Sequence, residues 1–111
     1  MKIKGRVIKG KGEGRKLGFP TANVLLAEKI PSGIFSAEVF FEGKVYQSAV
    51  FVSPDNNFLE AHIFDFTGDL YGQEIEVLIK DKIRDIVPFE SDEQMKALIA
   101  DDIKKILFMK Q

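Results

Sequence analysis

Turn-forming residues recur at short intervals through the first 90 residues, and this punctuation constrains the fold more than any other feature of the sequence. The clearest turn signals are Pro31-Ser32-Gly33, Glu42-Gly43, residues 54–57 and residues 67–69. The runs between them are rich in β-branched and aromatic residues, and in the last run apolar residues alternate with polar ones, which is typical of strands. We therefore expect strands at residues 2–9, 21–26, 34–41, 44–52, 58–66 and 73–86.

The end of the chain changes to a helical pattern. Ser91 followed by Gln94 forms a capping box, and Asp92 and Glu93 suit the positive end of a helix. Apolar residues then recur at helical spacing and form one stripe. The stripe consists of Met95, Leu98, Ile99, Ile103, Ile106 and Leu107. These signals predict a helix from about residue 92 to about residue 108, packed along one side.

Strands followed by a single helix predict an all-β fold with one C-terminal helix. A small antiparallel barrel with the helix packed on it fits this order best. Closure of the barrel would also remove exposed strand edges. The length of 111 residues suits one domain and is too short for two.

The composition excludes several classes of function. A net charge of −1 gives no global field that would recruit nucleic acid or an anionic membrane, so any anion site must be local. The absence of cysteine excludes disulfides, thiolate catalysis and zinc–thiolate sites. The first residues lack the apolar run of a signal peptide, and no stretch approaches 18 apolar residues. We expect a cytoplasmic protein.

The segment GKGEGRKLGFPTANV combines glycines with basic side chains. Backbone N–H groups of a glycine-rich loop can form a concave nest that binds phosphate. The residues suited to such a nest are Gly10, Lys11, Gly12, Gly14, Arg15 and Lys16. Their spacing differs from the dinucleotide fingerprint, and no Ser or Thr follows Lys16 as a P-loop requires. A loop that only carries solvated lysines is the alternative interpretation.

Thr21 and Asn23 follow this segment directly. In an extended chain both side chains point to one face, with Ala22 on the other. A hydroxyl and an amide oxygen form a weak neutral pair of ligands, which suits Mg²⁺ beside a phosphate loop. The alternative is that Asn23 merely caps a turn.

Glu60 is the best candidate for a catalytic carboxylate. A strand here directs Glu60 and His62 to one face together with flanking aromatic residues. A carboxylate in such surroundings is costly unless it is paired or acts as a general base. A surface glutamate on a solvated face is the alternative. His62, the one histidine, is expected to be structural, whereas Asp69 lies close enough to Leu70-Tyr71-Gly72 to suggest nucleotide contact.

Four blocks of the sequence together resemble a known family. They are GKGEGRKLGFPTANV, IPSGIFSAEVFFEGKVY, EAHIFDFTGDLYGQEIEV and IRDIVPFESDEQMKALIADDIKKI. In this order they resemble the successive blocks of riboflavin kinases of the bacterial and eukaryotic type, over nearly the whole chain. The unit LGFPTAN after a glycine loop is highly specific, and E-x-H followed by D-F-x-x-D-L-Y-G strengthens the match.

The resemblance implies a fold and an activity. It implies a six-stranded antiparallel Greek-key barrel at about residues 1–90 and a C-terminal helix at about 91–108, forming one riboflavin kinase domain over residues 1–111. It also implies an enzyme that uses ATP and Mg²⁺, or another divalent metal, to convert riboflavin to FMN. In bacteria such a domain often follows an FMN adenylyltransferase domain, whose motifs are absent from these residues. We therefore expect a stand-alone monomeric kinase with riboflavin and ATP as its partners.

The resemblance also assigns roles to residues by motif position. Residues 10–16 would close over the ATP phosphates, Thr21 and Asn23 would hold the Mg²⁺, and Glu60 would be the base for the riboflavin 5′-hydroxyl. The adenine side would be lined by the segment that contains Asp65, Asp69 and Tyr71. The flavin would be covered by the loop that contains Arg84 and Phe89.

One stretch departs from the family pattern. Between Tyr46 and Glu60 the chain reads QSAVFVSPDNNFL, with Ser53 where a glycine is expected and a very short turn. Two further interpretations therefore stay open. The chain could be a non-catalytic flavin- or nucleotide-binding barrel, or a small β-barrel interaction module.

Overall fold

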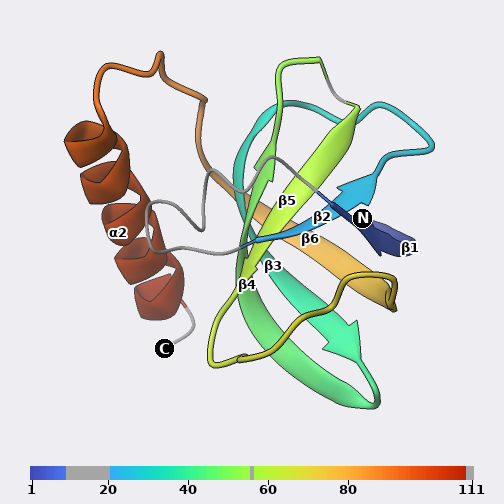
Figure 1. The fold of residues 1–111 in the computed structure, drawn as a ribbon. Helices are drawn as coiled ribbons and strands as arrows, with labels where there is room; N and C mark the ends of the chain where they lie inside the picture. The colour runs from blue at the N-terminus through green and yellow to red at the C-terminus, as the bar shows by residue number, and fades with distance from the viewer. Residues whose placement is uncertain (10–20, 56, 110–111) are drawn as a thin grey trace.

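The structure is a computed structural model that describes residues 1–9, 21–55 and 57–109. Its strands and helix are β1 (Lys2–Ile8), β2 (Ala22–Leu25), β3 (Gly33–Phe41), β4 (Lys44–Val52), β5 (Phe58–Ile63), β6 (Glu74–Arg84) and α2 (Asp92–Met109). Within these residues the six strands close into one antiparallel barrel in the order β1-β2-β5-β4-β3-β6, with α2 packed beside it (Figure 1).

The strand order is that of a Greek key. Strands β3, β4 and β5 are consecutive neighbours, and β6 returns along the outside of the group to pair with β3. Strand β1 then joins β6 to β2 and completes the closure. The predicted antiparallel Greek-key barrel with one C-terminal helix is therefore confirmed.

Four strands are shorter than the sequence suggested. Strand β1 ends one residue earlier, at Ile8, and β2 is one residue shorter at each end. Strand β5 ends at Ile63 rather than at residue 66, because Asp65 takes a left-handed backbone conformation with φ of 57°. Strand β6 runs from Glu74 to Arg84 rather than from residue 73 to residue 86. Its last residue already pairs with Ile34, the second residue of β3, so little of β3 is left for a longer strand to pair with.

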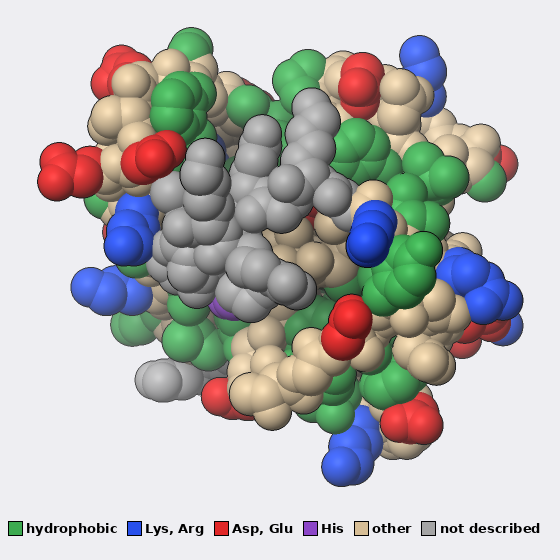
Figure 2. Space-filling view, in the orientation of Figure 1, with side chains coloured by type: hydrophobic (Ala, Val, Ile, Leu, Met, Phe, Trp, Pro, Cys, Tyr) green, Lys and Arg blue, Asp and Glu red, His purple; other side chains and the backbone are tan. Residues whose placement is uncertain are grey.

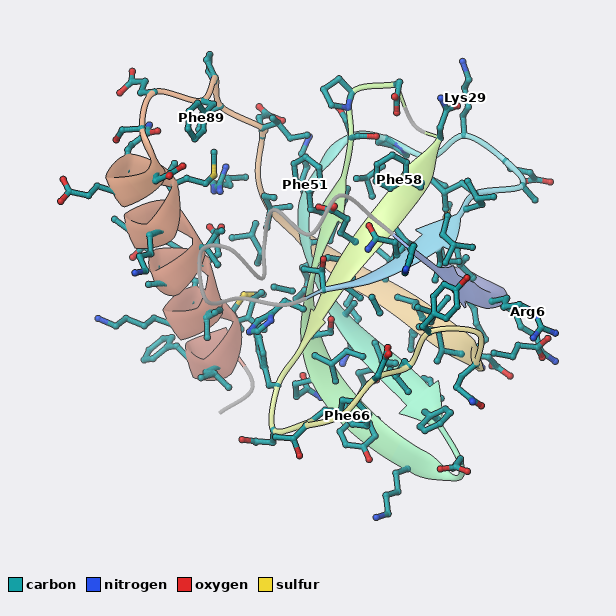
Figure 3. The ribbon with its side chains drawn as sticks, viewed as in Figure 1. Arg6, Lys29, Phe51, Phe58, Phe66 and Phe89 are labelled. Atoms are coloured by element: carbon teal, nitrogen blue, oxygen red, sulfur yellow. The ribbon has the colours of Figure 1, made fainter. Side chains whose placement is uncertain are left out.

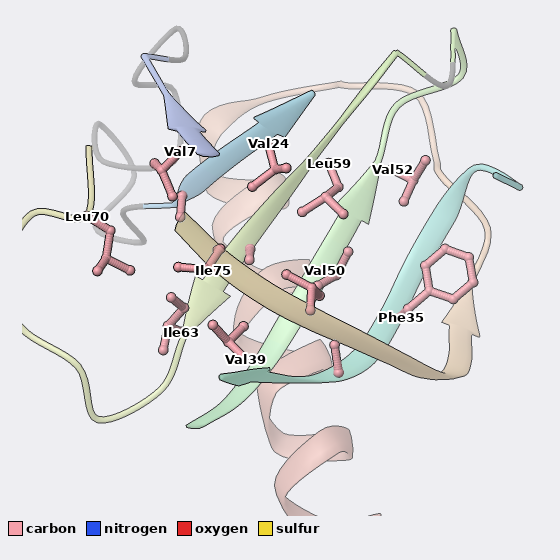
Figure 4. Packing of buried hydrophobic residues seen from close by; sticks show 14 of the residues in the cluster. Val7, Val24, Phe35, Val39, Val50, Val52, Leu59, Ile63, Leu70 and Ile75 are labelled. Atoms are coloured by element: carbon pink, nitrogen blue, oxygen red, sulfur yellow. The ribbon is translucent and has the colours of Figure 1, made fainter. Parts of the chain in front are cut away.

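The barrel interior is filled by alternate residues of every strand, mostly small or β-branched (Figure 4). The fully buried members include Val24, Ala37, Val39, Val50, Val52, Leu59, Ala61, Ile75 and Val77. A barrel of so few strands has a narrow interior, which favours these compact side chains. At Gly5 even a Cβ atom would lie 2.5 Å from Val24 Cγ1, so the backbone of β1 approaches β2 closely there.

The ladder between β3 and β6 contains two register shifts. Ala37 pairs with Ile79 and Ile34 with Arg84, so β6 gains two residues relative to β3. Ser36 stabilises the irregular region, because its Oγ accepts a hydrogen bond from Asp81 N at 3.1 Å and lies 3.4 Å from Asp81 O. The shifts bring Arg84 opposite Ile34, where an unshifted ladder would place an earlier residue of β6.

Ser91 caps the start of α2 as predicted, but the return bond from Gln94 reaches the residue before the cap, Glu90, and not Ser91 itself. Gln94 N donates to Ser91 Oγ at 3.1 Å, while Gln94 Oε1 accepts from Glu90 N at 3.3 Å. The helix contacts β4 and β6 on the outside of the barrel. Its buried residues are Ile106 and Asp102, whereas Leu107, expected in the apolar stripe, is exposed. Within the described ranges no helix has the length and apolar character needed to cross a membrane.

Candidate functional site

One residue from each of five neighbouring strands forms a single row across the outside of the barrel. The ladders pair Asn23 with Glu60, Glu60 with Phe51, Phe51 with Ile34, and Ile34 with Arg84. We call these five residues the outer row. On β2, β5, β4 and β3, their neighbours along the strand include Val24, Leu59, Ala61, Val50 and Phe35, which belong to the barrel core. Because side chains alternate along a strand, the row faces outward.

Asn23 is buried although it lies in the outer row, with 6% of its surface exposed. Among the residues that the structure describes, its Oδ1 atom is the one buried side-chain nitrogen or oxygen without a hydrogen-bond partner. A buried unsatisfied oxygen destabilises a fold unless a ligand or ion completes it. An orphaned amide oxygen is a suitable ligand for Mg²⁺, so the position fits the metal role assigned to Asn23.

Thr21 lies directly before β2 and is partly buried, two residues from Asn23. The described residues contain no group of three or more Asp, Glu or His side chains arranged to hold a metal. Neutral oxygens combined with those of a bound substrate are a ligand set with which Mg²⁺ commonly binds next to phosphates.

Glu60 points away from the barrel interior. Sequence reasoning left an inward orientation open, and that possibility is wrong, because Leu59, Ala61 and Ile63 occupy the inward positions of β5. Glu60 is nevertheless only partly exposed, since Asn23 and Phe51 lie opposite it on the two neighbouring strands. Phe64, expected on the face of Glu60, lies beyond the end of β5 and is buried. The ladder thus places the candidate base beside the candidate metal ligand.

The segment between β5 and β6 is attached to the end of β1. Gly72 N donates to Val7 O at 2.9 Å, and Val7 N donates to Gln73 O at 2.8 Å. Arg6 Nη1 adds a hydrogen bond of 2.7 Å to Gly72 O. These bonds fix the segment on which the nucleotide contacts were predicted.

Within that segment the three predicted nucleotide residues are all exposed. They are Asp65, Asp69 and Tyr71. Asp69 Oδ1 accepts a hydrogen bond of 2.9 Å from Tyr71 N, which closes a short turn. Leu70, between them, is buried in the core cluster and anchors the turn. Asp69 therefore has a structural role in this turn, and the 55% exposed Tyr71 is available to a ligand.

Arg84 forms a bidentate ion pair with Asp102 of α2. Arg84 Nε and Nη2 donate to the two carboxylate oxygens of Asp102, each at 2.8 Å, and Arg84 Nη1 donates to Asp85 O at 3.1 Å. Beyond it, Phe89 lies in the segment between β6 and α2 and is 63% exposed. Figure 3 shows Phe89 in the same upper part of the molecule as Phe51 of the outer row.

Sequence reasoning missed Asp102. A signal was present, because Asp102 lies three residues after Ile99 and four before Ile106, within the apolar stripe of the helix. An acid at such a position needs a buried partner. The partner is 18 residues earlier in the chain, and no local pattern identifies it.

The glycine segment lies outside the described residues. This applies to the predicted phosphate contacts Gly10, Lys11, Gly12, Gly14, Arg15 and Lys16. Its attachment points are described, since Ile8 of β1 pairs with Asn23 of β2. The end of β1 and the start of β2 therefore both lie next to Asn23, the candidate metal ligand. On the face shown in Figure 2, apolar side chains are interspersed with both acidic and basic ones, so no single sign of charge dominates it.

The short connection between β4 and β5 is organised by Asp55. Its Oδ1 accepts hydrogen bonds from Ser53 Oγ at 2.5 Å and from Asn57 N at 3.1 Å. Ser53, at the position where the sequence departs from the family pattern, is buried and serves this turn.

Comparisons with known proteins find similarity over nearly the whole chain. A family model described as riboflavin kinase (flavokinase) matches residues 1–109. Over 113 residues the chain is 38% identical to a bifunctional riboflavin kinase/FMN adenylyltransferase of Buchnera aphidicola subsp. Schizaphis graminum, covering 92% of this chain and 36% of the relative. The chain spans between 17% and 36% of the length of the curated relatives it matches.

Two solved structures share the fold. One, titled as a macrolide-efflux protein from Streptococcus pneumoniae, is 30% identical with a TM-score of 0.82, over 93% of this chain and 37% of that one. The other is the crystal structure of riboflavin kinase from Trypanosoma brucei, 22% identical with a TM-score of 0.69, over 97% of this chain and 78% of that one. At this low identity the second similarity supports the fold alone.

Proposed function

Because the chain belongs to the riboflavin kinase family, we propose that it transfers the γ-phosphate of ATP to the 5′-hydroxyl of riboflavin and so produces FMN. The observation that carries the proposal is the ladder pairing of Asn23 with Glu60 on the outside of the barrel. A buried oxygen without a partner and a carboxylate are thereby held side by side. Phosphoryl transfer needs mainly this kind of positioning and neutralisation of charge.

Glu60 acts as the general base in this proposal. The riboflavin oxygen forms a bond to the γ-phosphorus while the bond from that phosphorus to the bridging oxygen of ADP breaks. The proton of the hydroxyl passes to the Glu60 carboxylate. The partial burial of Glu60 between Asn23 and Phe51 limits its contact with water, which favours this transfer over side reactions.

Mg²⁺ is held by Asn23 and Thr21 in this proposal, and another divalent metal of similar size is an alternative occupant. The metal would neutralise negative charge on the ATP phosphates. Asn23 supplies its unpartnered Oδ1, and Thr21 supplies a hydroxyl two residues earlier in the chain. Substrate oxygens and water complete the coordination of such a weakly liganded ion.

The two substrates occupy opposite sides of this pair. We assign the phosphates of ATP to residues 10–16, whose attachment points flank Asn23, and the adenine side to the segment from Asp65 to Tyr71. Riboflavin is assigned to the side of Phe89 and Arg84. The exposed phenyl ring of Phe89 is suited to stacking on a flavin ring.

The remaining features of the protein are also proposals. We propose a cytoplasmic monomer, formed by one domain over residues 1–111, that acts without nucleic acid or membrane partners. A net charge of −1 supports the absence of an anionic polymer as partner. Light scattering during size-exclusion chromatography tests the oligomeric state, and a mass of twice 12.5 kDa would contradict it.

Incubation of the purified chain with riboflavin, ATP and Mg²⁺ tests the activity. The flavins are then separated by chromatography, and FMN is the expected product. If no FMN forms with any nucleotide or divalent metal, the kinase proposal is wrong. Retention of riboflavin binding in that case would favour the non-catalytic flavin-binding barrel.

A further inference from the structure

The ion pair between Arg84 and Asp102 is the most deeply buried charged contact among the described residues. The side chains of Arg84 and Asp102 are 17% and 3% exposed, whereas in each of the other ion pairs of these residues at least one side chain is far more exposed. A buried ion pair contributes little net stability compared with an apolar pair of the same size. Its bidentate geometry, however, fixes the relative orientation of the two groups. The pair is thus better suited to fixing the orientation of α2 against β6 than to stabilising the folded protein.

The pair connects the outer row to the helix. Arg84 is the last residue of β6, and the two register shifts bring it level with Ile34 and hence with Phe51 and Glu60. Asp102 lies in the middle of α2, on the side that faces the barrel. The ion pair therefore links α2, which also packs through the buried Ile106, to the row that contains the candidate base.

The same contact fixes both ends of the segment that contains Phe89. At one end Arg84 also donates a hydrogen bond to Asp85 O. At the other end Ser91 caps α2, whose position depends on Asp102. The residues between have no regular secondary structure of their own. The location of Phe89 relative to Glu60 thus depends on the ion pair.

We infer that Asp102 is a positioning residue for riboflavin, acting through Arg84 to hold the Phe89 segment and α2 beside Glu60. This inference rests on the proposed kinase function. Arg84 has three of its nitrogens engaged by Asp102 and Asp85. Its contribution on the flavin side is therefore indirect, through the segment it holds.

Asp102→Asn tests the inference because it removes the charge at nearly constant volume. We expect KM for riboflavin to rise about ten- to a hundredfold, because a small displacement of the groups that position a substrate has an effect of this size. KM for ATP should stay within about twofold, because the nucleotide lies on the other side of the row. Asp101→Asn is the matched control, since Asp101 is exposed and pairs only with Lys105 one turn along the helix. It should change neither KM.

Arg84→Lys and the double variant Arg84→Lys/Asp102→Asn distinguish positioning from direct contact. If the pair acts as a unit, each single change and the double change raise KM for riboflavin by a similar factor. An increase in Arg84→Lys without one in Asp102→Asn would mean that Arg84 itself binds the flavin, and would overturn the inference.

Replacement of both residues by leucine separates positioning from folding. Arg84→Leu/Asp102→Leu removes the buried charges together, so the protein should keep a melting temperature close to that of the wild type. We expect its KM for riboflavin to remain raised, and quenching of riboflavin fluorescence in the presence of Mg²⁺ and ADP should show the same weakened binding. A normal KM in this variant would contradict a positioning role. The wild-type assay is done first, so that a failure of the kinase proposal is recognised independently.

Discussion

At the scale of single residues, the candidate site depends on two side chains that lie far apart in the sequence. Asn23 and Glu60 are 37 positions apart, yet they are direct partners across the β2–β5 ladder. The sequence predicted that side chains would alternate between the two faces of each strand. It did not predict which face is inward, because both faces of residues 58–64 contain apolar side chains. Only the pairing of β5 with its neighbours decides it.

Glu60→Gln should separate binding from chemistry. The amide cannot accept the proton of the hydroxyl, so we expect kcat to fall by about 10²–10⁴-fold, with little change in ATP affinity. Steady-state kinetics and nucleotide titration measure the two effects. Glu76→Gln is the control, because Glu76 lies on β6 and pairs with Lys2. A near-normal kcat in Glu60→Gln would exclude Glu60 as the base.

Asn23→Leu should weaken metal binding and stabilise the metal-free protein. Without metal, removal of the unpartnered Oδ1 should raise the free energy of unfolding by about 1 kcal/mol. The Mg²⁺ concentration for half-maximal rate should rise roughly tenfold or more. Loss of a residue that only hydrogen-bonds a metal ligand already lowers metal affinity by about this factor, and loss of a ligand should cost at least as much. Urea unfolding and a Mg²⁺ titration measure these quantities. Unchanged metal dependence would remove Asn23 from the metal site.

At the scale of elements, the sequence predicted those helix and strand ends that depend on neighbouring residues alone. The beginning of α2 followed from Ser91 and Gln94, and the Ser91 side chain caps Gln94 N as the motif requires, whereas Gln94 Oε1 accepts from Glu90 N instead of from Ser91 N. The end of β5 did not follow from the sequence, because nothing there indicates that Asp65 adopts a left-handed conformation. The contact of Asp102 with Arg84 also lay beyond prediction, since it arises only when the helix packs on the barrel.

Ser91→Ala should destabilise the protein through the helix. Gln94 N would lose its acceptor at 3.1 Å, and we expect a loss of about 1 kcal/mol in the free energy of unfolding. Denaturant titration measures it. Ser91→Asp should keep the wild-type value because aspartate is an equally good cap. An equal loss in both variants would show that another interaction of Ser91 is responsible.

At the scale of the whole molecule, closure of the barrel is the constraint that organises the rest. The sequence predicted the class of fold from its turns and strands. It did not indicate that β2 pairs with β5 rather than with the next strand in sequence, because strand order depends on contacts between distant segments. For this reason the resemblance to a family was needed to bring Asn23 and Glu60 into one site.

Gly5→Ala tests how tightly the barrel closes. The new Cβ would lie 2.5 Å from Val24 Cγ1, so we expect a loss of about 1–3 kcal/mol in the free energy of unfolding from overpacking. Val24→Ala removes the clashing methyl groups, and the double variant should lose less than the sum of the two single changes. Strict additivity in denaturant titrations would contradict the proposed close approach.

The pairing of Asn23 with Glu60 has a consequence for how such proteins can diverge. Main-chain hydrogen bonds on both sides of β5 hold the spacing of the two side chains, so it does not depend on the length of any connection. The turn at Ser53–Asn57 can accept extra residues while the ladder keeps its register. Insertions in this turn can therefore accumulate in related chains while the spacing of Asn23 and Glu60 stays the same. The compact turn of this chain is one of many lengths that the same strand ladder permits.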